Sequence, residues 1–155
     1  MAVNSYKKVV VVFLHQNYDS YLLQLRDFTP SIIYPGHWGA FGGAVEDGES
    51  PEFAIHRELR EEIGYSPEKI NFYREDYKIQ GRIKLNIYIF YGSMNVSLAQ
   101  MSLMEGTDMG VFTKEEILTK SLFSSKIGKT FPIVPLLSEL FDDFFHYIDK
   151  NIKVL

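Results

Sequence analysis

The sequence contains no cysteine, and this absence excludes two classes of protein at once. Without thiols, the 155-residue chain can form neither a disulfide framework nor a metal site built on thiolates. Long hydrophobic runs are also missing, because the run Val9–Leu14 has six residues, too few for a membrane span or a secretory signal. These absences favour a cytoplasmic enzyme or binding protein with no membrane partner.

An excess of positive charge is missing as well. The chain has 16 Lys and Arg against 20 Asp and Glu, for a net charge of -4. Proteins that bind nucleic-acid duplexes need a cationic surface to neutralise phosphates, so this balance argues against such a partner. The length and the 46% share of hydrophobic residues are ordinary for a globular protein, and they predict one domain over residues 1–155.

The acidic residues are concentrated in one stretch. Between Gly43 and Tyr65 there are seven acidic and two basic residues, so this stretch has a charge of -5 and the rest of the chain +1. Glu58, Glu61 and Glu62 are spaced i, i+3 and i+4, which places them on one stripe of a helix, where like charges repel. A divalent cation would remove that repulsion, and carboxylate oxygens suit Mg²⁺ or Mn²⁺. A solvated acidic helix face is the alternative interpretation.

Hydrophobic patterns along the chain predict an α+β fold. The unbroken apolar run predicts a central strand over 6–14 that is covered on both faces, followed by a second strand over 21–26. The other predicted elements are a short strand over 38–43, a helix over 51–63, a hairpin whose strands flank Gly81, a strand over 109–112, a helix over 114–118 and a last helix with an apolar stripe from Ile133 to Ile148. The segments 28–37, 94–106 and 122–131 are predicted loops. This order indicates a mixed β-sheet between helices.

The helix over 51–63 has clear end signals. Ser50 is a favourable N-cap, Pro51 suits the first helical position, and Gly64 is a typical C-terminal stop. A second stripe beside the acidic one is apolar and should dock the helix onto the sheet. Its members are Ile55, Leu59 and Ile63. The aromatic residues Trp38 and Phe41 are predicted to lie in the core.

These residues together form a recognisable motif. Gly43, five residues, Glu49, seven residues and the run from Arg57 to Tyr65 (R-E-L-R-E-E-I-G-Y) match the Nudix box G-x5-E-x7-R-E-U-x-E-E-x-G-U, where U is aliphatic. Every fixed Gly, Glu and Arg is present, and the one departure is Tyr65 at the last aliphatic position. The chain therefore resembles the Nudix hydrolase family. That resemblance implies a Nudix-type α/β/α sandwich with a central mixed β-sheet.

The resemblance also implies a reaction, the hydrolysis of a nucleoside diphosphate linked to another group X with Mg²⁺ or Mn²⁺ as cofactor. The metal ligands that it implies are Glu58, Glu61, Glu62 and the backbone carbonyl of Gly42. Arg57 would orient the helix carboxylates, and Glu49 would support this arrangement. Metal ions are needed in any case, because a polyphosphate is repelled by a bare acidic segment.

The sequence leaves two candidates for the group that deprotonates the attacking water. Glu58 lies within the box, whereas Glu105 lies in a segment that resembles a loop from which some relatives contribute a further Glu. We favour Glu105 slightly, as base or extra metal ligand. Two residues are candidate substrate contacts: Arg26 at the end of the second strand, where a plain surface role is equally compatible, and Gly43, whose backbone a ligand can approach closely.

The substrate class is the last prediction. The compact chain favours a (d)NTP pyrophosphohydrolase of the MutT type, and a hydrolase of ADP-ribose or a nucleotide sugar is the alternative. A nucleotide-binding module without turnover is an alternative of a different class. The expected partner is thus a small-molecule nucleotide. The apolar C-terminal residues 152–155 leave open whether the chain forms a homodimer.

Overall fold

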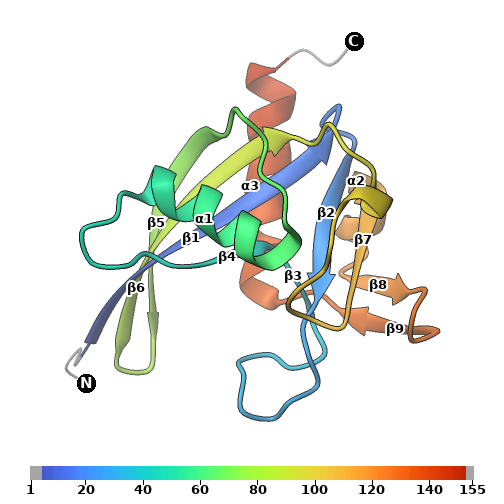
Figure 1. Ribbon diagram of the computed structural model, residues 1–155, viewed down its shortest axis with the longest axis horizontal. Helices are drawn as coiled ribbons and strands as arrows, with labels where there is room; N and C mark the ends of the chain where they lie inside the picture. Colours follow the sequence, from blue (N-terminus) through green and yellow to red (C-terminus); the bar gives the residue numbers. More distant parts are fainter. Residues whose placement is uncertain (1–4, 153–155) are drawn as a thin grey trace. The chain divides into compact units, whose positions relative to one another are not determined.

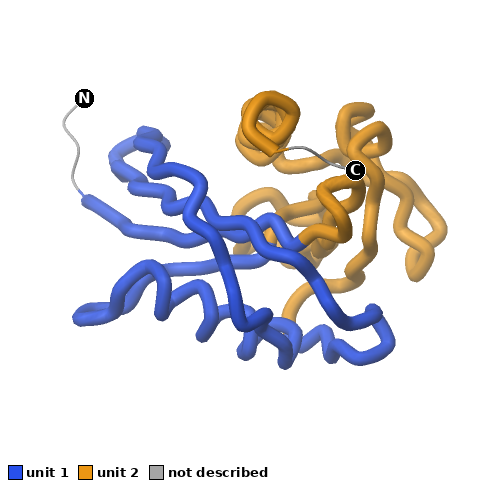
Figure 2. The backbone as a smooth tube through the Cα atoms, turned by 90° about the horizontal axis from the view of Figure 1, so that it is seen from above, with its two compact units in different colours: residues 1–14, 41–104 blue, residues 15–40, 105–155 orange. Residues whose placement is uncertain are grey.

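The computed structural model describes residues 5–152, and they form a mixed β-sheet with flanking helices. The described chain divides into two compact units, each made of two segments (Figure 2). Unit 1 contains residues 5–14 and 41–104, and unit 2 contains residues 15–40 and 105–152. In the predicted apolar C-terminal segment, residues 153–155 lie outside the part of the chain that the structure describes.

Unit 1 consists of sheet strands with one helix lying along a face of them (Figures 1 and 2). Its elements are most of β1 (Ser5–Gln16), β4 (Phe41–Ala44), α1 (Pro51–Ile63), β5 (Asn71–Gln80), β6 (Ile83–Ser93) and a short 3-10 turn, η1 (Leu98–Gln100). Strand β1 pairs antiparallel with β4 and neighbours β6, which pairs antiparallel with β5. The predicted hairpin around Gly81 is therefore confirmed.

Unit 2 begins with the end of β1, where His15 and Gln16 pair with β2. Its other elements are β2 (Ser20–Leu25), β3 (Trp38–Gly39), β7 (Asp108–Thr113), α2 (Lys114–Leu118), β8 (Ser121–Ser124), β9 (Lys129–Pro132) and α3 (Pro135–Asn151). Strand β2 pairs antiparallel with both β3 and β7. Among residues 5–152, none of the helices has the length and hydropathy of a membrane-spanning segment.

The ends of α1 lie where the sequence predicts them. The Ser50 side chain accepts a hydrogen bond from the Phe53 amide at 3.1 Å, and Pro51 is the first helical residue. Gly64 adopts the left-handed conformation with φ 66°, and its amide donates to the Arg60 carbonyl. Because both ends are set locally, the carboxylates of α1 have a defined position along the helix.

The predicted burial of β1 on both faces is wrong for its first residues. Tyr6, Lys7 and Lys8 are exposed, and the fully buried run begins further along the strand. The reason is the length of the neighbouring strand: β4 ends at Ala44, which pairs with Val9, and the chain then leaves the sheet. The start of β1 therefore has no β4 beside it.

Three further predictions need correction. The segment 122–131 is a β-hairpin, β8–β9, rather than a loop; the Trp38 indole donates to the Leu122 carbonyl at 2.9 Å and holds it in place. The apolar stripe of α3 starts later than predicted, because the helix begins at Pro135 and Ile133 forms a bridge with Trp38. The predicted strand over 38–43 is divided at Ala40 into β3 and β4.

Unit 2 buries a histidine at the end of β1. The ring of His15 stacks on Tyr18 at 4.1 Å, and its Nδ1 accepts a hydrogen bond from the Tyr18 amide at 3.2 Å. Burial penalises the charged imidazolium and lowers the pKa of His15 from 6.5 to about 4. The neutral ring is therefore the form that the fold accommodates.

This burial predicts a pH-dependent stability. Because the pKa of His15 is lower in the folded chain, its contribution is complete above about pH 6.5 and is lost as the pH falls toward 4. Between pH 7.5 and 5, the His15→Phe variant should lose about 1–2 kcal/mol less unfolding free energy than the wild type in urea titrations. His146→Gln, at an exposed position of α3, is the control and should follow the wild type. Equal losses in all three proteins would contradict the prediction.

Candidate active site

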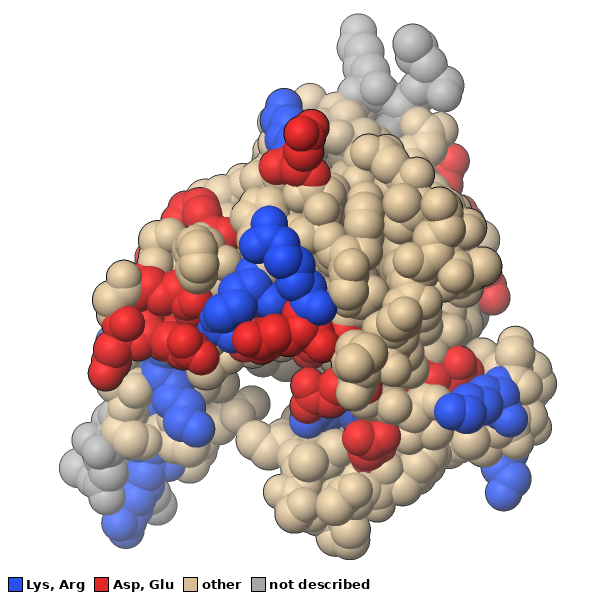
Figure 3. All heavy atoms as spheres, in the orientation of Figure 1, with Lys and Arg blue, Asp and Glu red and all other residues tan. Residues whose placement is uncertain are grey.

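Three glutamates project from α1 with different degrees of exposure. Glu62 is buried, at 4% exposed, whereas the side chains of Glu58 and Glu61 are 14% and 60% exposed. A carboxylate oxygen of Glu62 accepts a hydrogen bond from the Gly42 amide at 3.1 Å, and its main-chain carbonyl accepts one from Met104 at 2.8 Å. Figure 3 shows acidic side chains gathered over α1 and the loop before it, with basic groups among them. The predicted acidic stripe is thus present on the folded helix.

Arg57 connects these glutamates to the loop that precedes α1. Its guanidinium binds Glu49 with two hydrogen bonds, Nε to Oε2 at 2.6 Å and Nη2 to Oε1 at 2.8 Å. Its Nη1 donates to Glu58 at 3.1 Å and to Glu61 at 3.2 Å, and Nη2 also donates to the Ala44 carbonyl at 3.0 Å. One side chain therefore orients two carboxylates of α1 and holds the end of β4.

The Arg57–Glu49 pair is charged on both sides. Hydrogen bonds from Arg57 lower the pKa of the Glu49 carboxyl to about 2, and the hydrogen bond to Glu49 is the main cause that raises the pKa of Arg57. The side chain of Glu49 is 6% exposed, so it is shielded from solvent in this position. Glu49 therefore holds the Arg57 guanidinium in place through two hydrogen bonds.

The two glycines before the loop are required by close contacts. A Cβ at Gly43 would lie 2.4 Å from the carboxyl carbon of Glu58, and a Cβ at Gly42 would lie 1.9 Å from the Val10 carbonyl oxygen. Gly42 also has a φ of 154°, which side chains rarely adopt. The glycine pair thus lets the carboxylates of α1 approach the backbone of β4.

The donor groups at this place fit a hard divalent cation. Carboxylate oxygens of Glu58, Glu61 and Glu62 lie on successive turns of one helix, beside the backbone of Gly42, and such oxygens are the ligands of Mg²⁺ and Mn²⁺. Within residues 5–152, no three His, Asp or Glu side chains already converge as ligands of one ion. Arg57 supplies the positive charge among these carboxylates in the present arrangement.

The other predicted site residues belong to unit 2. The Nε of Arg26 donates to the Ile33 carbonyl at 2.8 Å, and the Arg26 amide donates to the His37 carbonyl at 2.9 Å, so this residue closes the loop between β2 and β3. Glu105 is exposed in a bend before β7. The structure therefore gathers the Nudix-box residues within unit 1, whereas roles for Arg26 and Glu105 stay predictions.

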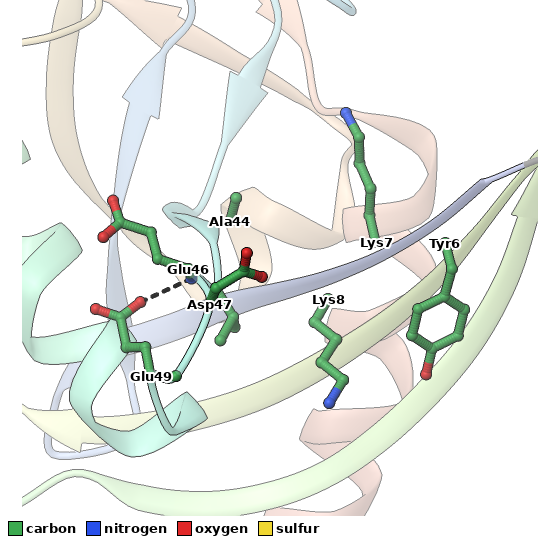
Figure 4. Close-up of a pocket in the computed structure, with 9 residues that line it drawn as sticks. Tyr6, Lys7, Lys8, Ala44, Glu46, Asp47 and Glu49 are labelled. Carbon is green, nitrogen blue, oxygen red and sulfur yellow. Dashed lines mark hydrogen bonds between the residues drawn. The ribbon is translucent and has the colours of Figure 1, made fainter.

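Two contacts of the Arg57 network lie outside the motif positions. The Ala44 carbonyl accepts from Arg57, and the Glu46 carboxylate lies 3.7 Å from its Nη1. The Glu46 amide donates to the Glu49 carboxylate at 3.0 Å, which helps to orient that side chain (Figure 4). The contact with the Ala44 carbonyl could not be predicted, because every residue has a backbone carbonyl. The contact with Glu46 could have been considered, because Glu46 is an acidic residue only three positions before Glu49.

Comparison with known proteins connects this geometry to a family. Residues 5–118 match the family described as NUDIX domain. Among curated proteins, the nucleoside triphosphatase NudI of Escherichia coli O139:H28 is 42% identical over 59 residues, and that of Enterobacter sp. is 38% identical over 58 residues. Each match covers 37% of this chain and 40% of the relative, so the matched segment is well short of the relatives' full length.

Solved structures agree with the predicted fold. A MutT protein from Methanosarcina mazei Go1 has a TM-score of 0.73 at 20% identity, covering 96% of this chain and 97% of its own. A MutT NUDIX hydrolase from Burkholderia pseudomallei has a TM-score of 0.61 at 18% identity, covering 88% and 96%. At these identities the likeness concerns the fold, and it confirms the Nudix-type sandwich predicted from the sequence.

The arginine network predicts the effect of removing its centre. Arg57→Met should leave the shielded Glu49 carboxylate without its partner, lower the unfolding temperature by about 5 °C and raise the pKa of Glu49 from about 2. The wild type should lose stability as the pH falls from about 4.5 to 2, because Glu49 then takes up a proton, and Arg57→Met should show less of this loss. Scanning calorimetry across this pH range measures both effects.

The matched control is Arg60→Met, which removes the same charge from an exposed position of the same helix. It should unfold within about 1 °C of the wild type. Combining Arg57→Met with Glu49→Gln removes the unpaired charge and should recover part of the lost stability. If the Arg57 and Arg60 variants behave alike, the network does not hold α1 to the loop.

Proposed function

The chain belongs to the Nudix family, and on this premise we propose that it is a Mg²⁺- or Mn²⁺-dependent hydrolase that cleaves nucleoside triphosphates to nucleoside monophosphates and pyrophosphate. The observation that carries the proposal is the complete acidic set on α1, oriented by one arginine that Glu49 holds. The local likeness to NudI, whose name describes a nucleoside triphosphatase, supports a triphosphate as substrate.

In this mechanism the carboxylates of Glu58, Glu61 and Glu62 hold the cation, together with the backbone carbonyl of Gly42. When bound, a divalent metal neutralises phosphate oxygens and lowers the pKa of a water molecule that it binds. Arg57 keeps Glu58 and Glu61 oriented before substrate arrives, so little reorganisation is needed. The absence of a side chain at Gly43 lets the Glu58 carboxylate lie against the backbone of β4.

A carboxylate must also accept the proton of the attacking water. Glu58 is a candidate within the acidic set, and Glu105 of unit 2 is the other candidate. Glu58 is half-buried and already accepts a hydrogen bond from Arg57, whereas Glu105 is exposed. Glu105 remains a candidate for the base or for a further metal ligand. Arg26 remains a candidate substrate contact. Both roles are those that the sequence analysis assigned to these residues.

Product analysis on a nucleotide panel tests the proposed substrate class. With Mg²⁺, nucleoside triphosphates should give pyrophosphate, and turnover should fall to background when the metal is chelated. Release of AMP and ribose phosphate from ADP-ribose, with triphosphates untouched, would instead make the chain an ADP-ribose or nucleotide-sugar hydrolase. Tight nucleotide binding without cleavage of any panel member would show a binding module without turnover.

Substitution of single carboxylates tests the metal site. Glu58→Gln and Glu62→Gln each remove one negative oxygen, so kcat should fall about 100-fold or more at saturating Mg²⁺. Glu52→Gln is the control, because it removes an exposed carboxylate from the first turn of the same helix and should keep wild-type turnover. Circular dichroism should show the same folded content in all variants. Wild-type turnover of the Glu62 variant would overturn the metal assignment.

A further inference from the structure

The bend that precedes β7, residues 105–107, begins with Glu105. The side chain of Glu105 is exposed and makes no hydrogen bond or ion pair with other residues in the described range 5–152. Its position therefore depends on the backbone of the bend rather than on contacts of its own. The residues that hold this backbone belong to unit 2.

The backbone of the bend is fixed to the end of β2. The Thr107 amide donates a hydrogen bond to the Leu25 carbonyl at 2.8 Å. Gly106 has a φ of 97°, which favours glycine, and a Cβ at this position would lie 2.9 Å from Oε1 of Gln24 and 3.1 Å from the Leu25 carbonyl oxygen. The chain beside Glu105 thus lies against β2, with little room for a side chain at position 106.

Thr107 is held through each of its polar groups. Besides the bond of its amide, its Oγ1 donates to Oδ1 of Asp27 at 2.8 Å, and its carbonyl accepts from Nζ of Lys126 at 2.9 Å. Asp27 lies in the loop after β2, whereas Lys126 lies in the turn between β8 and β9. Two segments that are far apart in the sequence therefore meet at one residue, two positions after Glu105.

The turn that carries Lys126 is also fixed beside β7. The Oγ of Ser124 donates to Oδ2 of Asp108 at 2.7 Å, and Ser124 is fully buried. The same oxygen accepts from the Ile127 amide at 3.1 Å, which closes the turn around Lys126. Because buried hydrogen bonds are costly to break, the β8–β9 hairpin is a firm second support for the bend.

We propose that Thr107 is a positioning residue that holds Glu105 for its part in hydrolysis, and that the β8–β9 hairpin contributes to this through Lys126. This inference rests on the proposed hydrolase function. Exposed loops are usually mobile, whereas the backbone beside Glu105 is held from two sides. A carboxylate that accepts a proton or binds a metal needs a fixed geometry, because a displacement of about 1 Å can lower the rate about 100-fold.

Kinetics with a matched set of variants test Thr107. Thr107→Val removes the hydroxyl but keeps a branched side chain, so the kcat for nucleoside triphosphates should fall about 10-fold while KM stays within about twofold. Thr107→Ser keeps the hydroxyl and should restore most of this kcat. Thr130→Val is the control, because it makes the same change at an exposed position of β9 and should keep the wild-type kcat.

The hairpin contact is tested at an exposed position, where a substitution leaves the core intact. Lys126→Met removes the hydrogen bond to the Thr107 carbonyl and should lower kcat in the same direction as Thr107→Val. Lys129→Met removes the same charge from an exposed position of β9 and should keep the wild-type kcat. Wild-type kcat in both the Thr107→Val and the Lys126→Met variants would overturn the inference.

A double substitution separates positioning from a general effect on the fold. In a Glu105→Gln background, Thr107→Val should cause no further fall in kcat, because its effect acts through Glu105. Equal falls in both backgrounds would overturn the inference, and so would a wild-type kcat of Glu105→Gln alone. Neither result bears on the proposed function, which is judged by whether the wild-type chain cleaves nucleoside triphosphates with Mg²⁺.

Discussion

The bidentate pairing of Arg57 with Glu49 is the interaction on which the rest of the site depends. It joins the helix that carries the acidic groups to the loop that enters that helix, through hydrogen bonds of 2.6 and 2.8 Å. The same guanidinium also reaches Glu58 and Glu61. A cluster of like charges on one helix face would otherwise spread apart, so the arginine keeps the carboxylates in position.

Local signals explain which parts of the fold could be predicted. The ends of α1 follow from Ser50, Pro51 and Gly64, whose effects need only their neighbours in the chain. The β8–β9 hairpin could not be predicted, because Leu122 is held there by the Trp38 indole from a distant position. The exposed start of β1 was missed for a similar reason, since its cover depends on where another strand ends.

The candidate site also has parts that the sequence predicts and parts that it does not. The spacing of Glu58, Glu61 and Glu62 predicts their common stripe, because helical geometry alone determines it, and the Nudix box adds Arg57 and Glu49 as their supports. The contact with the Ala44 carbonyl carries no sequence signal, because every residue has such a group. Residues from unit 2 are a different case. Their roles in the Nudix reaction depend on tertiary placement, and so Arg26 and Glu105 stay proposals.

Glu62 accepts hydrogen bonds from two different backbone amides. Its carboxylate accepts the Gly42 amide hydrogen of β4, while its main-chain carbonyl accepts that of Met104. Any event that draws the carboxylate toward another charge releases the first of these amides and leaves the second bonded. The hydrogen-exchange rate of the Gly42 amide on β4, compared with that of the Met104 amide after η1, therefore reports whether the Glu62 carboxylate still binds β4.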